Sequence, residues 1–299
     1  MNLIVLSRMG ELRIGGQAVM NGVMMRSKNY IATSVRKKDG KIKTKTRKFV
    51  SITDKYKILG LPFIRGIFML FELMIQGMKE LTWSSNESTD DEDEKLSKKE
   101  IVFTIILSIV FALALFKLLP WFLANTVSGF FETTSATINV LDALFKVFIL
   151  AGYIYLISLM PDIKTLFRYH GAEHKAVSCY ESGKKLTPKN AAGFSVIHPR
   201  CGTTFIILVF FVSIFFYMLI PTLEFWQNYL FRILLLPVIA GFSYEIIRLG
   251  GKYYYKNVLV RIIMWPGLQF QRLTTRQPDL KQIEVAIKSL NVALKKEKA

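Results

Sequence analysis

Residues Ile101–Ala124 read IVFTIILSIVFALALFKLLPWFLA, an apolar stretch with a single charged side chain, Lys117. A helix of this length can cross the hydrocarbon core of a bilayer, which requires about 20 residues. Soluble domains of ordinary composition rarely contain such a stretch. Residues 101–124 therefore predict a transmembrane helix and place the chain among integral membrane proteins.

Three later segments have the same character, namely Val140–Met160, Thr203–Ile220 and Trp226–Arg248. Each approaches the length that a bilayer requires, so we predict four transmembrane helices within residues 101–248. The expected fold class is mainly α: a polytopic membrane protein with four transmembrane helices, interfacial helices and a small N-terminal β-rich cytoplasmic subdomain.

The basic residues of the connections predict the orientation of these helices. The connections 125–139 and 221–225 contain no Lys or Arg, whereas the loop 161–202 contains seven. Cytoplasmic loops carry an excess of Lys and Arg. We therefore expect this His/Cys loop and both termini to be cytoplasmic, in a multi-pass protein of the plasma membrane.

The composition agrees with this assignment and bears on partners. The chain is 52% hydrophobic, yet it carries 40 Lys and Arg against 22 Asp and Glu. Nucleic-acid-binding proteins can be this basic, but they rarely contain several long apolar stretches, so no nucleic-acid partner is expected. The expected partners are the lipid bilayer and a protein or lipid-linked substrate. Two cysteines cannot form a disulfide framework and are free thiols or metal ligands in a reducing cytosol.

Residues 1–58 predict a β-rich cytoplasmic subdomain. The extended stretches Tyr30–Arg36 and Lys41–Val50 flank Lys38-Asp39-Gly40, and Asp-Gly between such stretches is typical of a hairpin. Basic residues gather in this region. We interpret them as an exposed strand face that also rests against anionic lipid.

Residues 59–82 are apolar but carry polar side chains along one stripe, namely Arg65, Glu72, Gln76 and Lys79. This pattern predicts an amphipathic helix that lies in the membrane interface or packs in the core. Residues 83–100 contain the acidic stretch Asp90–Glu94 and predict a disordered linker.

Residues 249–299 predict two further cytoplasmic helices. One covers Val258–Phe270, lies in the interface and ends at Pro266-Gly267. The other begins after Pro278 and is amphipathic and lysine-rich, so it is expected to dock on the soluble part or on the membrane surface.

All three histidines and both cysteines lie between His170 and Cys201. A helix over Asp162–Glu181 would place His174 about 40° and Glu173 about 60° from His170 around the helix axis. Two histidines at this spacing can share a metal ion. The predicted ligands of a divalent metal, expected to be zinc, are His170, His174, His198 and Cys201. Cys179 lies on the opposite face and is interpreted as a packed side chain.

The segment from His170 to His174 has the H-x-x-E-H pattern of inverted zincins, in which the glutamate is a general base. Glu173 is therefore the predicted catalytic residue. Glu181 and Glu245 are expected as further ligands or as partners of the ligands, with pairing to Arg248 as the alternative for Glu245.

The glycine-rich segment Gly15–Arg26 has two interpretations. Its polar residues Gln17, Asn21 and Arg26 either support the site or a substrate, or belong to turns that the glycines form.

Four segments of the chain, Gly15–Arg26, Tyr169–Lys175, His198–Thr203 and Leu273–Arg276, resemble the YqhQ-like family. This is a bacterial family of unknown function whose members are described as multi-pass membrane proteins and predicted metal-dependent enzymes. The resemblance covers nearly the whole chain and implies both properties here.

Two functions are consistent with these patterns. The first is a metal-dependent, zinc-containing hydrolase at the cytoplasmic face of the bacterial membrane, with an open coordination position. The alternative is a non-enzymatic membrane-protein assembly or scaffold factor with a structural metal site closed by four protein ligands. The carboxylate of Glu173 on the ligand face favours the hydrolase.

Overall fold

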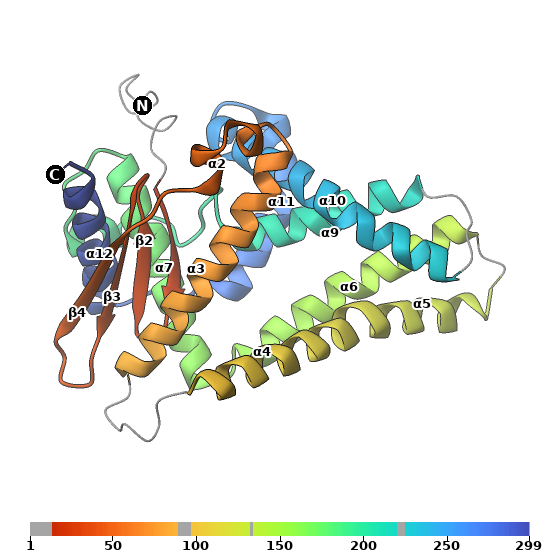
Figure 1. Cartoon of the computed structure of the whole chain (residues 1–299), viewed down its shortest axis with the longest axis horizontal. Helices are drawn as coiled ribbons and strands as arrows, with labels where there is room; N and C mark the ends of the chain where they lie inside the picture. Colours follow the sequence, from red (N-terminus) through yellow and green to blue (C-terminus); the bar gives the residue numbers. More distant parts are fainter. Residues whose placement is uncertain (1–13, 89–96, 132–133, 220–224, 299) are drawn as a thin grey trace.

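A computed structural model of the chain describes residues 14–88, 97–131, 134–219 and 225–298. The described chain is mainly helical and contains a four-stranded antiparallel sheet near its N-terminus (Figure 1). The strands are β1 (Gly15–Val19), β2 (Gly22–Arg26), β3 (Tyr30–Arg36) and β4 (Ile42–Lys48). The helices that follow the sheet are α2 (Ile52–Lys55), the 3-10 helix η1 (Lys57–Gly60), α3 (Ile64–Ser88), α4 (Lys98–Leu113), the π-helix η3 (Ala114–Leu118), α5 (Leu119–Ser128), α6 (Ser135–Ile157), α7 (Pro161–Glu181), α8 (Pro188–Ala192), α9 (Gly202–Met218), α10 (Phe225–Tyr253), α11 (Val258–Thr274) and α12 (Leu280–Lys298).

The sheet is a meander with tight turns, and its strand order is β1-β2-β3-β4. Asn21 has a φ of 51° between β1 and β2, and Gly40 has a φ of 83° between β3 and β4. These left-handed conformations are ones that Asn and Gly adopt readily. In the second hairpin Tyr30 pairs with Lys48 and Arg36 with Ile42, which confirms the predicted hairpin.

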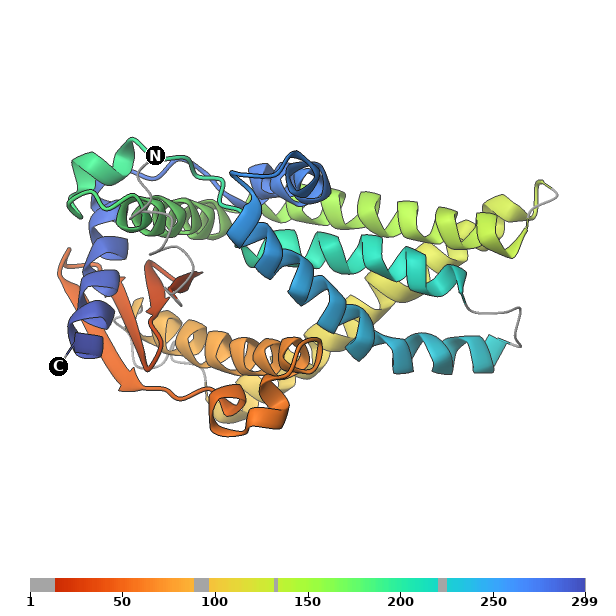
Figure 2. The same ribbon diagram turned by 90° about the horizontal axis from the view of Figure 1, so that it is seen from above.

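Helices cover both faces of the sheet (Figure 1 and Figure 2). Val23 and Met25 of β2 point toward α7 and α12, whereas Met24 between them points toward α3. Successive side chains of a strand point to opposite faces, so β2 contributes to two cores. The folded unit therefore extends beyond residues 1–58, and the terminal helix α12 packs on the sheet and on α7.

The basic side chains of β4 face α3. Arg47 Nε lies 2.8 Å from the carboxylate of Glu80, and Lys43 Nζ lies 2.9 Å from that of Glu87. Lys45 lies over the ring of Trp83. α3 therefore covers this face of β4 and supplies the opposite charges, while contact of the other basic residues of this region with lipid stays a prediction.

The predicted polar stripe of residues 59–82 is used for packing. Arg65 binds Glu245 of α10, Glu72 accepts a hydrogen bond from Ser51, and Gln76 accepts one from Arg47. α3 then continues to Ser88, so the first residues of the predicted linker 83–100 are helical. The acidic stretch 90–94 lies outside the described residues.

Three stretches of the described chain are long and apolar enough to cross a membrane, namely Lys99–Ser128, Thr137–Ile157 and Leu230–Tyr253. They correspond to the first, second and fourth predicted transmembrane helices. The helix at the third position, α9, is shorter, and Ile220 at the end of the predicted segment lies outside the described residues. Figure 2 shows α5, α6, α9 and α10 extending from the layered part that contains the sheet.

α11 does not end at Pro266-Gly267 as predicted, because it continues to Thr274. Gly267 serves close packing: a Cβ atom added there would lie 2.5 Å from Thr204 Cγ2 of α9. Pro266 has no backbone N–H to donate, which weakens the helix. The packing of Gly267 against α9 can offset this loss of stability. The continuation matters, since it carries Gln271 and Thr274 to the histidine cluster.

The buried Glu80 carboxylate provides a test of the α3–sheet contact. We expect Arg47→Ala to reduce the stability by about 3 kcal/mol, because removal of one partner leaves a buried charge uncompensated. The apparent Tm of the detergent-solubilised chain should then fall by about 6 °C or more in thermal unfolding. The matched change Lys43→Ala, which breaks a more exposed pair, should cost less than about 1 kcal/mol. Equal effects of the two substitutions would contradict this account.

Candidate metal centre

The helix predicted over Asp162–Glu181 is confirmed as α7, which begins with Pro161 in its first turn. Proline is favoured there because the first N–H groups of a helix have no intrahelical partner. The central part of α7 is buried against β1, β2, α8 and α12. Its side chains are therefore held in fixed directions by packing on several sides.

His170, His174 and Cys201 come together on one side of α7. One ligand atom of each lies within 4.8 Å of the others, and His170 Nε2 is 3.2 Å from Cys201 Sγ. Cys201 is the N-cap of α9, and the N–H of Thr203 donates to its sulfur at 3.4 Å. The positive end of a helix favours a thiolate at this position.

Backbone carbonyls orient both imidazole rings. His170 Nδ1 lies 2.9 Å from the carbonyl oxygen of Thr274, and His174 Nδ1 lies 2.5 Å from that of Val196. A carbonyl only accepts, so each Nδ1 carries the proton and donates it. Each Nε2 then points toward the cluster, and in the neutral imidazole its lone pair can bind a metal.

The cluster also changes proton affinities. Burial raises the pKa of the Cys201 thiol, but the charges and hydrogen bonds of His170 and His174 outweigh this effect, so the pKa lies well below its usual range. Burial lowers the pKa of His174, but the charge and hydrogen bond of Cys201 together with the charge of Glu173 outweigh it, so the pKa is raised. The site thus favours a thiolate, the form of cysteine that binds metals.

Glu173 lies at the edge of the cluster and is buried. Its Oε2 is 3.5 Å from His174 Nε2. Gly16 of β1 makes room for it, since a Cβ atom there would lie 2.7 Å from Glu173 Cγ and 2.6 Å from the Met24 carbonyl oxygen. This contact explains why the glycine-rich segment must lack a side chain at position 16.

His198 is adjacent to the cluster, but its ring nitrogens are engaged elsewhere. Its ring centroid is 5.7 Å from that of His174. Nε2 lies 3.3 Å from Glu181 Oε2, and Nδ1 accepts a hydrogen bond from the Arg200 N–H at 3.3 Å. Glu181 also forms an ion pair with Arg200. His198 and Glu181 therefore form a neighbouring pair behind the three converging donors.

The structure places Glu245 at Arg65, whose Nε donates to it at 2.8 Å, with Arg248 farther away at 3.8 Å. Sequence analysis had not paired Glu245 with Arg65, because 180 residues separate them.

The polar residues of the glycine-rich segment have structural contacts. Asn21 forms the β1–β2 turn, and the guanidinium of Arg26 lies over the ring of Phe49. The amide of Gln17 packs at Gly77 of α3. These positions favour the turn interpretation, and the contribution of the segment to the site comes from Gly16.

Gln271, which no sequence pattern singled out, holds the backbone next to the cluster. Its fully buried amide accepts from the His198 N–H at 2.9 Å and donates to the His198 carbonyl at 2.8 Å and to Thr204 Oγ1 at 2.7 Å. Gln271 thus fixes the backbone of the turn that leads to Cys201. The available signal was a glutamine on the buried side of an amphipathic helix, but the predicted end of that helix at Gly267 hid it.

Lys175, beside the histidines in sequence, is directed away from them. Its Nζ donates to the carbonyls of Ala192 and Phe194 at 2.7 and 2.5 Å. Its charge is therefore balanced by backbone dipoles at the end of α8 rather than directed at the candidate metal centre.

The two cysteines provide a test of the electrostatics. In metal-free protein, Cys201 should retain thiolate ultraviolet absorbance at pH about 7, below the ordinary thiol pKa of about 8.5. A lowered pKa keeps the thiolate at lower pH, and His170→Ala should move its titration to higher pH. Burial raises the pKa of Cys179, so Cys179→Ala should leave the signal unchanged while Cys201→Ala removes it. A signal that disappears with Cys179 would refute the assignment.

Comparison with known proteins identifies the family. A family model described as a protein of unknown function, DUF1385, matches residues 61–296. The chain is similar to the uncharacterized protein YqhQ of Bacillus subtilis (strain 168), with 36% identity over 302 residues that cover 95% of this chain and 92% of that protein. No solved structure matches. The chain therefore belongs to the DUF1385, or YqhQ-like, family of proteins of unknown function.

Proposed function

We propose that the chain is a zinc-dependent hydrolase at the cytoplasmic face of the bacterial membrane. The observation that carries this proposal is the convergence of His170 Nε2, His174 Nε2 and Cys201 Sγ, with both Nδ1–H groups bound to backbone carbonyls. Any buried Nδ1–H needs an acceptor, so the feature that favours a metal is the convergence of the two rings on the Cys201 sulfur. It is the arrangement expected of metal ligands that are oriented from behind.

The donor set fits zinc. Two imidazole nitrogens and one thiolate are donors that Zn²⁺ accepts in tetrahedral sites. Three protein ligands characterise catalytic zinc sites, whereas structural sites have four. Because both ring nitrogens of His198 are engaged by Glu181 and Arg200, three donors converge and a fourth position is left for a reactant.

Zinc, when bound, supplies Lewis acidity that promotes ionisation of water and polarises a carbonyl or phosphoryl oxygen. The chain supplies the proton acceptor. Glu173 lies beside His174, is buried, and has an acceptor oxygen within 3.5 Å of the ligand nitrogen. In the proposed reaction Glu173 takes a proton from the attacking water and returns it to the leaving group.

The membrane setting supports a substrate that arrives from the bilayer. α7 follows the apolar helix α6 after a short connection, and Cys201 immediately precedes α9. We propose that α9 is the fourth transmembrane helix and that the loop 161–202 and both termini are cytoplasmic, as the positive-inside rule indicates. A peptide or lipid-linked substrate would then reach the site at the membrane surface.

The burial of the cluster favours the second candidate, an assembly or scaffold factor with a structural metal. His174 and Cys201 are only 2% and 6% exposed. Rotation of the nearby His198 ring away from Glu181 would provide a fourth ligand and close the site. The experiments below separate the two candidates.

Metal content is the first test. Purified full-length protein should contain about one zinc per chain by elemental analysis, in keeping with a single site. His170→Ala, His174→Ala and Cys201→Ala should each remove most of it, because each deletes a converging donor. Cys179→Ala is the matched control and should retain the metal, as should His198→Ala if three donors suffice. Protein that contains no metal, or that keeps it after His174→Ala, contradicts the proposal.

The role of Glu173 is the second test. Glu173→Gln preserves shape but removes the base, so it should keep the zinc and fail to complement a strain that lacks this protein. The rate of the proposed hydrolysis should fall at least about 100-fold, as is typical when a general base is removed. Full complementation by Glu173→Gln together with retained zinc would favour the structural candidate.

A further inference from the structure

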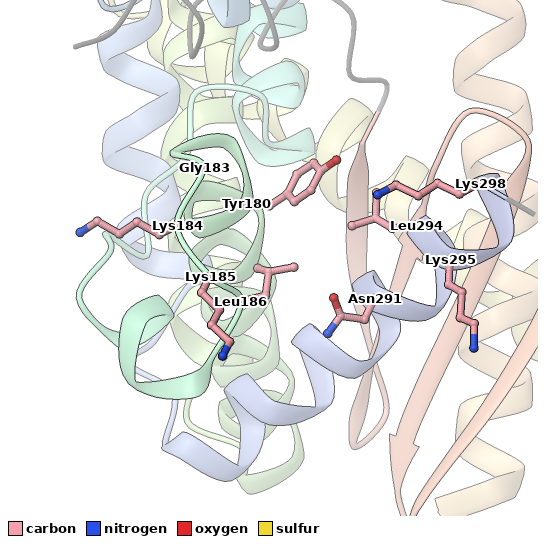
Figure 3. Close-up of a pocket in the computed structure, with 9 residues that line it drawn as sticks. All are labelled: Tyr180, Gly183, Lys184, Lys185, Leu186, Asn291, Leu294, Lys295 and Lys298. Carbon is pink, nitrogen blue, oxygen red and sulfur yellow. The ribbon is translucent and has the colours of Figure 1, made fainter.

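A pocket of about 570 Å³ lies where the end of α7 meets the last turns of α12. Figure 3 shows it between the Gly183–Leu186 loop and α12. Small-molecule sites typically occupy roughly 300–1,000 Å³, so the pocket has the size of one. It is separate from the histidine cluster and has no part in the proposed hydrolysis.

Among the residues that the structure describes, four lysines and no carboxylate line the pocket. They are Lys184, Lys185, Lys295 and Lys298. The negative ends of α7 and α12 each contribute roughly half a negative charge, so the pocket retains about three positive charges. About one positive charge would balance the two helix ends, so the four lysines leave an excess of positive charge in the pocket.

The two carboxylates closest in sequence are engaged elsewhere. Glu181 contacts His198 and Arg200, and Glu297 accepts hydrogen bonds from Ser27 and Asn29. Neither of them lines the pocket. Lys184 Nζ lies over the ring of Phe194, a contact that does not neutralise its charge, so the lysines can attract an anion from solution.

The pocket also has an aromatic and aliphatic part beside its lysines. In Figure 3 the Tyr180 ring from α7 and the Lys298 amine from α12 point toward each other across it. Leu186 and Leu294 line its apolar part, and Asn291 contributes an amide. A ligand that fits must combine concentrated negative charge with a part that an aromatic ring and aliphatic side chains can contact.

We propose that this pocket binds a nucleotide-sized anion that bears two or more phosphate groups. Lysine is a common phosphate binder that acts as a point charge. In Figure 3 the amines of Lys184, Lys185 and Lys295 point away from the space between Tyr180 and Lys298, and their flexible side chains allow a bound polyphosphate to draw them inward. The Tyr180 ring and the leucines contact the uncharged part.

Binding is tested by calorimetry on full-length protein in an uncharged detergent, with ATP, tripolyphosphate, inorganic phosphate and adenosine as probes. ATP and tripolyphosphate should bind saturably, and inorganic phosphate and adenosine should bind far more weakly. The double change Lys295→Gln and Lys298→Gln should weaken ATP binding at least about tenfold, since two charge-assisted contacts are lost. Tyr180→Leu should weaken ATP binding more than tripolyphosphate binding.

The matched control is the double change Lys281→Gln and Lys288→Gln, which removes the same charge from exposed positions of α12 outside the pocket. It should alter ATP binding less than about twofold, because distant exposed charges are screened by salt. Equal weakening by the two double changes would show diffuse surface attraction and overturn the proposal. The absence of saturable binding of both ATP and tripolyphosphate would also overturn it. Neither result bears on zinc content, so this proposal and the hydrolase proposal fail separately.

Discussion

The close crossing of the Thr274–Arg276 segment over α7 is the constraint on which the site depends. A Cβ atom at Gly171 would overlap the Arg276 carbonyl oxygen, so only glycine permits this approach. A hydrogen bond from the Arg276 N–H to the Phe167 carbonyl, 3.0 Å long, stabilises this close approach. It brings the Thr274 carbonyl to His170 Nδ1 and so decides which ring nitrogen faces the cluster.

Buried polar groups fix the other half of the site in the same way. Gln271 satisfies both backbone groups of His198 and thereby holds the turn that presents Cys201 at the start of α9. Buried polar groups are costly when unpaired, so a fully paired network of this kind selects one backbone arrangement. α7, α9 and α11 together therefore determine the geometry of the site. The layers formed by α3, the sheet and the pair α7 and α12 keep α7 rigid.

Several features of the fold could be predicted because they depend on local patterns. The Asp39-Gly40 turn, the α7 helix and the amphipathic α12 follow from turn chemistry and hydrophobic periodicity. The end of α11 could not be predicted, since Gly267 is a packing residue whose partner Thr204 is distant in the sequence. The ion pairs of β4 could not be predicted for a related reason: Glu80 belongs to a helix expected at the membrane interface or in the core, and Glu87 to a segment expected to be a linker.

The apolar stretches, the charge asymmetry of the connections and the placing of His170, Glu173 and His174 on one side of a helix all follow from residue type and spacing. Which of the four proposed ligands converge depends instead on packing between distant parts of the chain. Cys201 joins the two α7 histidines, whereas His198 is held by Glu181 and by the Arg200 N–H. The physical reason is that the group bound to one ring nitrogen of an imidazole determines whether the other nitrogen offers its lone pair to the cluster. For His170 that partner is a carbonyl 104 residues away.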